Sequence, residues 1–348
     1  MRRLITAAGA ATLVLLTAAG TTLACGGLIG PNGAVNLLRT TTFAGYHDGI
    51  EHYVTSFEFA GGGGAFGSIV PLPGVPSNVE RGGDWTLQRL LRETEPVEDF
   101  GFERLSAASA AGESAEVLLE TKIDALDITV LKGGGDQVGT WAKDHGFRLP
   151  PDAPEVLDFY AERSPIFLAA SFDAAAAAER GQQLGDGTPV HVTVPTPNPW
   201  VPLRILGLGK NGQERIEADV YLLTDRKPVM LPVGRENGLL IEHNAPATEL
   251  LLNDLRSDKG MEWIPESGWL TKIGVDATAA QLKHDLAIDA SGQGQPSLVA
   301  AGMKLPGPAQ APVPTDNALA LVLASSLLLI AAAVVGVRLG RPSITPAQ

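Results

Sequence analysis

Four side chains that could bind a metal ion lie close together near the start of the chain: His47, Asp48, Glu51 and His52. Imidazole nitrogens and carboxylate oxygens are common zinc ligands in proteins. A helical zinc motif places its ligands one turn apart, whereas these residues surround an Asp-Gly pair that is typical of a hairpin turn. His47, Glu51 and His52 are therefore candidate metal ligands, and polar decoration of a hairpin is the alternative. In an extended strand, Glu51 and His52 would face opposite sides.

A glycine-rich segment, Gly207 to Gly212, matches the pattern G-x-G-x-x-G. A dinucleotide site needs such a loop to open a helix, and residues 213–223 have the pattern of a strand instead. The segment is therefore expected to be a hairpin tip, and no cofactor is expected. For nucleophilic catalysis, the sequence holds no G-x-S-x-G motif, and its serines and histidines are scattered. No catalytic residue is assigned, which favours a protein that is not an enzyme.

The most distinctive local segment runs from Pro195 to Pro202 and contains four prolines and one tryptophan. Prolines hold the backbone extended at little entropic cost, so such a segment can dock onto a partner. A stiff connection between two strands, with the tryptophan covering the edge of the core, is the alternative. The candidate docking residues are Pro195, Pro197, Pro199, Trp200 and Pro202.

The N-terminus has the pattern of an export signal. Residues 1–24 begin with Met1-Arg2-Arg3 and continue with an apolar stretch, which is typical of a signal peptide that is cleaved before Cys25. An uncleaved N-terminal anchor is the alternative. Cys25 is the only cysteine of the chain, so no intramolecular disulfide can form. Its thiol is a candidate for lipid attachment or for an intermolecular disulfide.

The C-terminal part has the pattern of a membrane anchor. Residues 318–337 carry no charge and are long enough to cross the hydrocarbon core of a bilayer as a helix. Arg338 and Arg341 follow, and basic residues beside a span favour the cytoplasmic side. We therefore expect one transmembrane helix, a short cytoplasmic tail at 338–348 and the rest outside. Residues 290–317, rich in Pro, Gly and Ala, are expected to form a stalk for an extracytoplasmic domain at 25–289.

The part predicted to lie outside is strongly acidic. It holds all 39 acidic residues but only 22 of the 26 basic ones, because Arg2, Arg3, Arg338 and Arg341 lie in the flanking segments, and its formal net charge is −17. This charge opposes binding to nucleic acids and permits cations, basic proteins or basic peptides as partners. General solubility is the alternative explanation for the charge.

Strand patterns alternate with short helical patterns within the predicted domain. Residues 35–46 and 50–59 predict a hairpin, and 201–206 predict a further strand. Asp84 is placed to cap a helix that ends at Glu95-Pro96. Because most connections between strands are too short for a helical crossover, we expect an α+β fold: a mixed, largely antiparallel β-sheet domain with short helices, plus one C-terminal transmembrane helix.

The chain carries, in order, Cys25-Gly26-Gly27, FGSIVPLPGVP at 66–76, LDITVL at 126–131, Trp141, and GFRLP at 146–150. In order and spacing these segments resemble a family of exported bacterial proteins, domain of unknown function 2330. The resemblance implies an extracytoplasmic domain behind a signal sequence, often with a C-terminal span, and no assigned activity. Relatives commonly carry a second cysteine where this chain has Gly30, so a family disulfide would be unavailable here.

These features predict a single-pass protein of the bacterial cell membrane, with its N-terminal domain outside and its C-terminus in the cytoplasm. We expect the anionic domain to be a binding or interaction module for an envelope protein or another basic partner. The alternative is an envelope hydrolase or metal-dependent enzyme whose site is assembled from distant residues.

Overall fold

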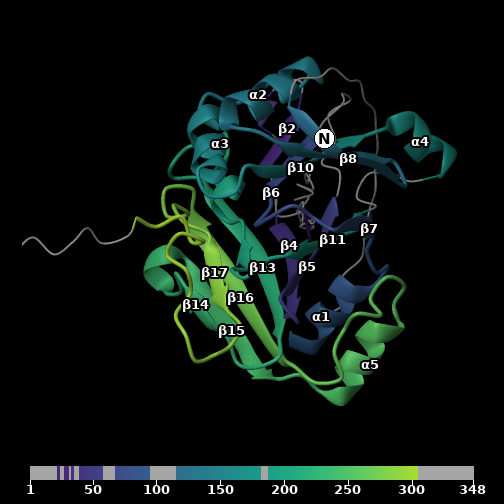
Figure 1. Cartoon of the computed structure of the whole chain (residues 1–348), viewed down its shortest axis with the longest axis vertical. Helices are drawn as coiled ribbons and strands as arrows, with labels where there is room; N and C mark the ends of the chain where they lie inside the picture. The colour runs from purple at the N-terminus through teal and green to yellow at the C-terminus, as the bar shows by residue number, and fades with distance from the viewer. Residues whose placement is uncertain are drawn as a thin grey trace, which may run out of the picture. The chain divides into compact units, whose positions relative to one another are not determined.

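The computed structural model describes residues 22–23, 27–30, 33–34, 39–57, 67–94, 115–181 and 187–304 (Figure 1). These residues belong to a unit that ends at Lys304. Within them, strands dominate, the α-helices are short, and most neighbouring strands are antiparallel. The predicted α+β class with mixed, largely antiparallel sheet is therefore confirmed.

The larger sheet has eight strands among the described residues, in the order β15-β16-β13-β4-β5-β11-β7, with β1 also paired to β4. Their bounds are β1 Thr22–Leu23, β4 Arg39–His47, β5 Ile50–Phe57, β7 Asn78–Arg81, β11 Thr188–Pro195, β13 Arg215–Thr224, β15 Leu239–Pro246 and β16 Trp269–Thr278. β4 runs parallel to β13 and to β1, and the other pairs are antiparallel. The centre of this sheet thus joins strands that are far apart in the sequence.

Two smaller sheets complete the strand arrangement of the described part. A six-stranded sheet has the order β3-β2-β6-β10-β9-β8, and a three-stranded sheet has the order β12-β17-β14. Their bounds are β2 Gly27–Gly30, β3 Gly33–Ala34, β6 Gly67–Pro71, β8 Glu116–Ile123, β9 Leu126–Lys132, β10 Ile166–Phe172, β12 Trp200–Val201, β14 Val229–Leu231 and β17 Leu286–Asp289. Tyr53 of β5, Val192 of β11 and Leu168 of β10 belong to one buried cluster, so the two larger sheets share a core.

Helices cover the outer faces of the two larger sheets (Figure 1). Their bounds are α1 Thr86–Thr94, α2 Gly135–Asp144, α3 Ala153–Ala161, α4 Ala174–Glu179 and α5 Glu249–Ser257, with short 3₁₀ turns η1 Arg204–Gly207 and η2 Arg235–Asn237. Trp141 of α2 and Phe167 of β10 share a cluster on the six-stranded sheet. Leu90 of α1, Leu251 of α5 and Phe43 of β4 share another on the larger sheet. The face under α1 and α5 carries the candidate site.

The predicted hairpin around His47-Asp48-Gly49 is confirmed, with β4 and β5 as its strands. Asp48 and Gly49 have φ values of 50° and 79°, so both turn residues are in the left-handed region. Asp tolerates this region better than most residues and Gly adopts it freely, which is why Asp-Gly favours such two-residue turns.

Two local predictions are wrong, because distant side chains decide the structure there. Residues 201–206 do not form one strand: β12 ends at Val201, and the chain turns into η1. The backbone N–H groups of Leu203 and Arg204 donate to buried Asp285, at 2.7 and 2.8 Å. Likewise, the start of α1 is held by Asp258, which accepts from the N–H groups of Asp84 and Trp85. Asp84 instead pairs with Arg81 at the surface.

Several predicted segments lie outside the described residues. They are the signal peptide at 1–24 apart from Thr22–Leu23, Cys25, the stalk from 305 onward, the transmembrane helix at 318–337 and the tail at 338–348. The first part of the predicted stalk, 290–304, belongs to the unit that ends at Lys304. There, Ala301 is buried and its carbonyl accepts from the N–H of Asp285 at 3.0 Å. Across the described ranges, no helix has the length and apolar character needed to cross a membrane.

Candidate functional site

The three candidate metal ligands do not converge. Glu51 and His52 are neighbours on β5 and face opposite sides of the sheet, whereas His47 shares the face of His52 but lies at the end of β4. Glu51 is fully buried on the inner side, where its Oε2 accepts from the N–H of Trp200 at 3.3 Å. In the described part of the chain, no group of three or more His, Cys, Asp or Glu residues is placed to hold a metal ion.

His52 instead contacts a second histidine. Its Nδ1 lies 2.9 Å from Nε2 of His191, which is 139 residues away in the sequence. β5 and β11 are adjacent antiparallel strands, and this pairing brings the two imidazoles together. Both rings are buried, with exposed fractions of 8% for His52 and 2% for His191. We call these two residues the histidine pair.

A loop between α5 and β16, residues 258–268, lies over the histidine pair, and we call it the covering loop. Its Trp263 stacks on His52, with ring centroids 3.8 Å apart and ring planes 4° apart. The same indole lies 5.6 Å from His191 and 5.8 Å from Phe43, centroid to centroid. Met261 and Ile264 of the loop are buried beside it. Aromatic stacking and apolar burial thus fix the loop on the sheet.

Charged groups face the histidine pair from three elements. Nδ1 of His191 lies 3.4 Å from Oε1 of Glu80 on β7. Burial, together with nearby His191 and His47, lowers the pKa of His52 to about 3. Burial also lowers the pKa of His191, and Glu80 and Glu262 act in the opposite direction. Both rings are therefore neutral at pH 7, with one nitrogen of the 2.9 Å contact donating and the other accepting.

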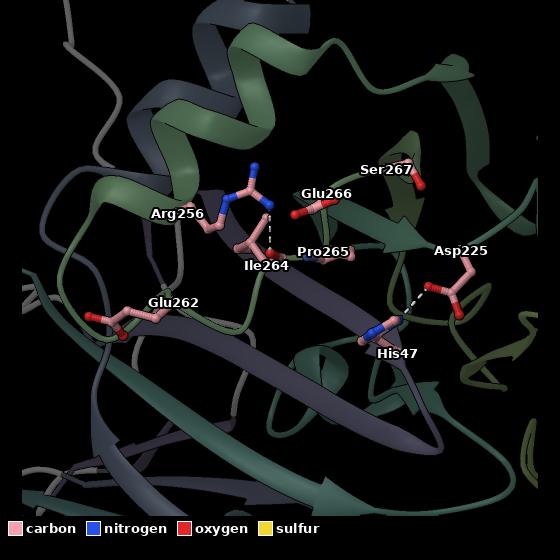
Figure 2. A pocket seen from close by; sticks show the side chains of 8 residues that line it. All are labelled: His47, Asp225, Arg256, Glu262, Ile264, Pro265, Glu266 and Ser267. Atoms are coloured by element: carbon pink, nitrogen blue, oxygen red, sulfur yellow. Dashed lines mark hydrogen bonds and ion pairs between the residues drawn. The ribbon is translucent and has the colours of Figure 1, made fainter.

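An open pocket of about 620 Å³ lies beside the covering loop (Figure 2). It is lined by His47, Asp225, Arg256, Glu262, Ile264, Pro265, Glu266 and Ser267, and we call it the His47 pocket. Figure 2 shows Asp225 and Glu262 at opposite sides of it. Five of its eight lining residues belong to the covering loop, which therefore forms most of its wall.

The polar groups of the His47 pocket are mainly acidic. Nδ1 of His47 lies 2.6 Å from Oδ1 of Asp225. Arg256 has its guanidinium engaged by the protein: Nη1 donates to the carbonyl of Ile264 at 3.2 Å, and Nη2 donates to Asn253 at 2.7 Å. The carboxylates of Glu262 and Glu266 have no opposite charge among the described lining residues beyond that arginine and His47. Such a pocket favours a cation.

The candidate docking segment is split between surface and core. Pro195 and Pro197 are exposed, whereas Pro199, Trp200 and Pro202 are buried. The Trp200 ring lies 4.5 Å from the guanidinium carbon of Arg163, which also pairs with buried Asp285. Trp200 is thus packed against the buried ion pair of Arg163 and Asp285.

The glycine-rich segment at 207–212 also differs from expectation. It joins η1 to β13, and since β12 and β13 belong to different sheets, it is not a hairpin tip. No helix follows it, because β13 begins at Arg215. The structural context of a dinucleotide loop is therefore missing.

Sequence reasoning missed the partners that complete the site: His191, Trp263, Glu262 and Asp225. Each lies far from His47 and His52 in the sequence, and strand pairing or loop packing brings it close. A weak signal existed for His191: it alternates with Val190 and Val192, a pattern typical of a strand, in which His191 faces the side opposite to the two valines.

Residues 19–231 match a family described as uncharacterized proteins conserved in bacteria, DUF2330. The chain belongs to this family. The DUF2330 match includes His47, His52 and His191, whereas the covering loop with Trp263 lies beyond its end. No curated protein matches the chain.

Three solved structures of baculovirus P35 are similar to this DUF2330 chain. Baculovirus P35 itself is 10% identical with a TM-score of 0.39, covering 72% of this chain and 96% of that one. A mutated P35 after caspase cleavage is 8% identical with a TM-score of 0.39, covering 74% and 98%. P35 in complex with caspase-8 is 9% identical with a TM-score of 0.37, covering 72% and 96%. Likeness at this level supports no inference about function.

Proposed function

We propose that this DUF2330 protein is a binding module of the bacterial cell envelope whose His47 pocket takes a lysine or arginine side chain of a partner protein. The observation that carries the proposal is the charge of the pocket. Three carboxylates line it, from Asp225, Glu262 and Glu266, against the one guanidinium of Arg256, which donates to neutral acceptors of Ile264 and Asn253, so negative charge predominates in the described lining. An incoming cation would meet attraction from several sides at short range.

The pocket has the character of a recognition site for one side chain. Its volume of about 620 Å³ accommodates a long aliphatic stem with a charged head. Ile264 and Pro265 supply apolar surface for such a stem, and the carboxylates supply acceptors for the head. The predicted charge of −17 on the outer part of the chain would add long-range attraction for a basic partner.

We also propose the location in which this module works. Cleavage before Cys25 and a membrane helix at 318–337 would display the domain outside the cell, with the tail at 338–348 in the cytoplasm. The sequence patterns of the two ends support this proposal independently of each other. A basic segment of another envelope protein is then the partner that the pocket would meet.

The binding proposal is tested with the purified full-length chain in a mild non-ionic detergent and a fluorescein-labelled hexalysine peptide at pH 7.5. Fluorescence anisotropy is expected to show saturable binding that weakens as salt is added. Replacing two pocket carboxylates, Glu262→Gln with Glu266→Gln, should lower the affinity about tenfold, since each charge contact contributes on the order of 0.5 to 1 kcal/mol.

A matched control removes the same charge elsewhere. Glu120→Gln with Asp136→Asn changes two exposed carboxylates that lie away from the pocket, on β8 and α2. This variant should bind hexalysine within about twofold of the wild type, because only long-range attraction is reduced. Equal losses in both variants would overturn the pocket assignment and leave only general charge attraction.

The location is tested by fractionating bacteria that express the full-length chain. It should remain in the membrane pellet after alkaline carbonate extraction, whereas a variant that ends at Lys304 should be released as soluble protein. Protease added to intact spheroplasts should degrade the domain. Carbonate release of the full-length chain, or protection of the domain from the protease, would overturn the proposed topology.

A further inference from the structure

The contact within the histidine pair requires that one of its two nitrogens carries a proton and the other does not. At 2.9 Å, Nδ1 of His52 and Nε2 of His191 form a hydrogen bond in which one nitrogen carries the proton and the other offers its lone pair. If both rings become imidazolium ions, both nitrogens carry protons and the contact turns repulsive. Each proton that enters the pair in the closed site is also disfavoured by burial.

The covering loop depends on this contact. Trp263 lies flat on His52 at 3.8 Å, and it also spans Gly45 of β4 and His191 of β11. In this position the indole lies over both imidazoles, which their mutual contact holds in one layer. Glu262 and Ile264 flank Trp263 directly in the sequence and line the His47 pocket, so release of the covering loop from the sheet would alter the wall of that pocket.

The charged groups around the histidine pair either favour or disfavour a proton on its rings. His47 of β4 disfavours a charge on His52. Glu80 of β7 and Glu262 of the covering loop favour a charge on His191. Thr193 of β11 lies 3.4 Å from His191 Nε2 through its uncharged hydroxyl. Burial outweighs the two carboxylates, so the closed site keeps both rings neutral.

We propose that the histidine pair is an acid-sensitive latch, which holds the covering loop closed over the larger sheet when neutral and releases it on protonation. In the open loop the imidazoles would be solvated and would regain an ordinary pKa near 6.5. The equilibrium constant for opening should then rise about tenfold for each pH unit below 6.5, for each histidine that is protonated only in the open state. Opening therefore begins well above the pKa of the closed site.

The latch also regulates ligand binding if the His47 pocket has the proposed function. A cation bound beside Glu262 weakens the carboxylate's attraction for a proton on His191, so cation and proton binding oppose each other. Mild acid should consequently lower the affinity for a basic side chain. This step rests on the proposed function, whereas the latch itself does not.

Amide hydrogen exchange of the full-length chain tests the latch directly. The N–H groups of Met261 and Ile264 donate within the covering loop, to Asp258 and Met261, and exchange when the loop opens. After correction for intrinsic rates, their opening constant should rise at least about tenfold from pH 7.5 to 5.5. In His52→Gln, which cannot be protonated, the rise should be smaller by about tenfold, and in the control His243→Gln on β15 it should equal the wild type.

A second measurement does not depend on any variant. Nuclear magnetic resonance titration of the wild-type histidine rings should show that the pair stays neutral at pH 5.5 in the closed state. Titration of His52 near pH 6.5 without any change at the covering loop would overturn the latch, as would an equal pH response in wild type and His52→Gln. Hexalysine binding at pH 7.5 reports on the pocket alone, so a failed pocket and a failed latch are distinguished.

Discussion

The indole of Trp263 lies against Gly45, in the space that a Cβ at position 45 would occupy. The indole atoms there are Cη2 and Cζ3 of the six-membered ring. β4 pairs Gly45 directly with His52, so the missing side chain leaves a flat place on the sheet beside the imidazole. Glycine at this position thus allows the covering loop to approach the strand closely.

We expect Gly45→Ala to push Trp263 away from the sheet. Crowding of this kind costs about 1 to 3 kcal/mol of unfolding free energy, and it should also raise amide exchange in the covering loop at pH 7.5. Urea denaturation measures the first effect. The control is Gly139→Ala in α2, where an added Cβ meets only Leu149 Cδ1 at 3.4 Å. This change should stabilise by about 0.5 to 1 kcal/mol, because alanine favours a helix. Equal stability of Gly45→Ala and wild type would contradict the close packing.

Asp258, from a distant part of the chain, anchors the segment that leads into α1. Its carboxylate accepts from two backbone N–H groups and from the hydroxyl of Thr86. Asp258→Ala should therefore lower the unfolding free energy by about 1 to 3 kcal/mol, because it leaves donors at a buried site without their acceptor. Asp84→Ala removes the cap that the sequence predicts, and should cost less than about 0.5 kcal/mol, since Asp84 is exposed. The reverse order of the two losses would show that Asp84 is the cap.

Glu51 gives a pH-dependent prediction. Burial raises its pKa from an ordinary 4.5 to about 8, against the opposing hydrogen bond from Trp200. Between these values the unfolded chain is ionised while the folded chain keeps its proton, so stability is lost as pH rises from 4.5 to 8. Glu51→Gln removes this loss and should be more stable than wild type by on the order of 3 to 5 kcal/mol at pH 8.

Denaturation of both proteins at pH 4.5, 6 and 8 measures the effect of Glu51→Gln. The difference should shrink to a small fraction of this value at pH 4.5, where the wild-type carboxyl is protonated in the folded chain and half protonated in the unfolded chain. Glu120→Gln, an exposed control, should show no such trend. A difference that stays constant across this range would contradict a raised pKa at Glu51.

The local parts of the fold could be predicted from the sequence. The hairpin at His47-Asp48-Gly49 was predictable because its turn depends on two adjacent residues. β15 was not predicted, since Leu239 is its only buried residue and an edge strand with so little burial lacks the alternating apolar pattern. The strand predicted at 201–206 fails for a different reason: Asp285, buried and far away, draws the backbone into a turn.

The candidate site was predictable only in part. His47 and His52 could be singled out by residue type, and their placement on strands of a hairpin followed from the Asp-Gly turn. The residues that contact them could not be predicted in the same way. β11 contributes His191 by strand pairing, and the loop after α5 contributes Trp263 by packing. Both relations depend on the register and layering of the sheets, which no local pattern encodes.

The parallel pairing of β4 with β13 has a consequence for the order in which the fold can be completed. Residues 40–46 pair with residues 218–224. During synthesis, one edge of β4 therefore has no hydrogen-bonded partner strand at these residues until β13 has emerged. β13 then needs β16 on its other edge, and β16 lies beyond residue 231, where the family match ends. A chain stopped at that residue would expose a long apolar strand edge that can pair with other chains. In this chain, residues 19–231 therefore depend on the later strand β16 to cover that edge.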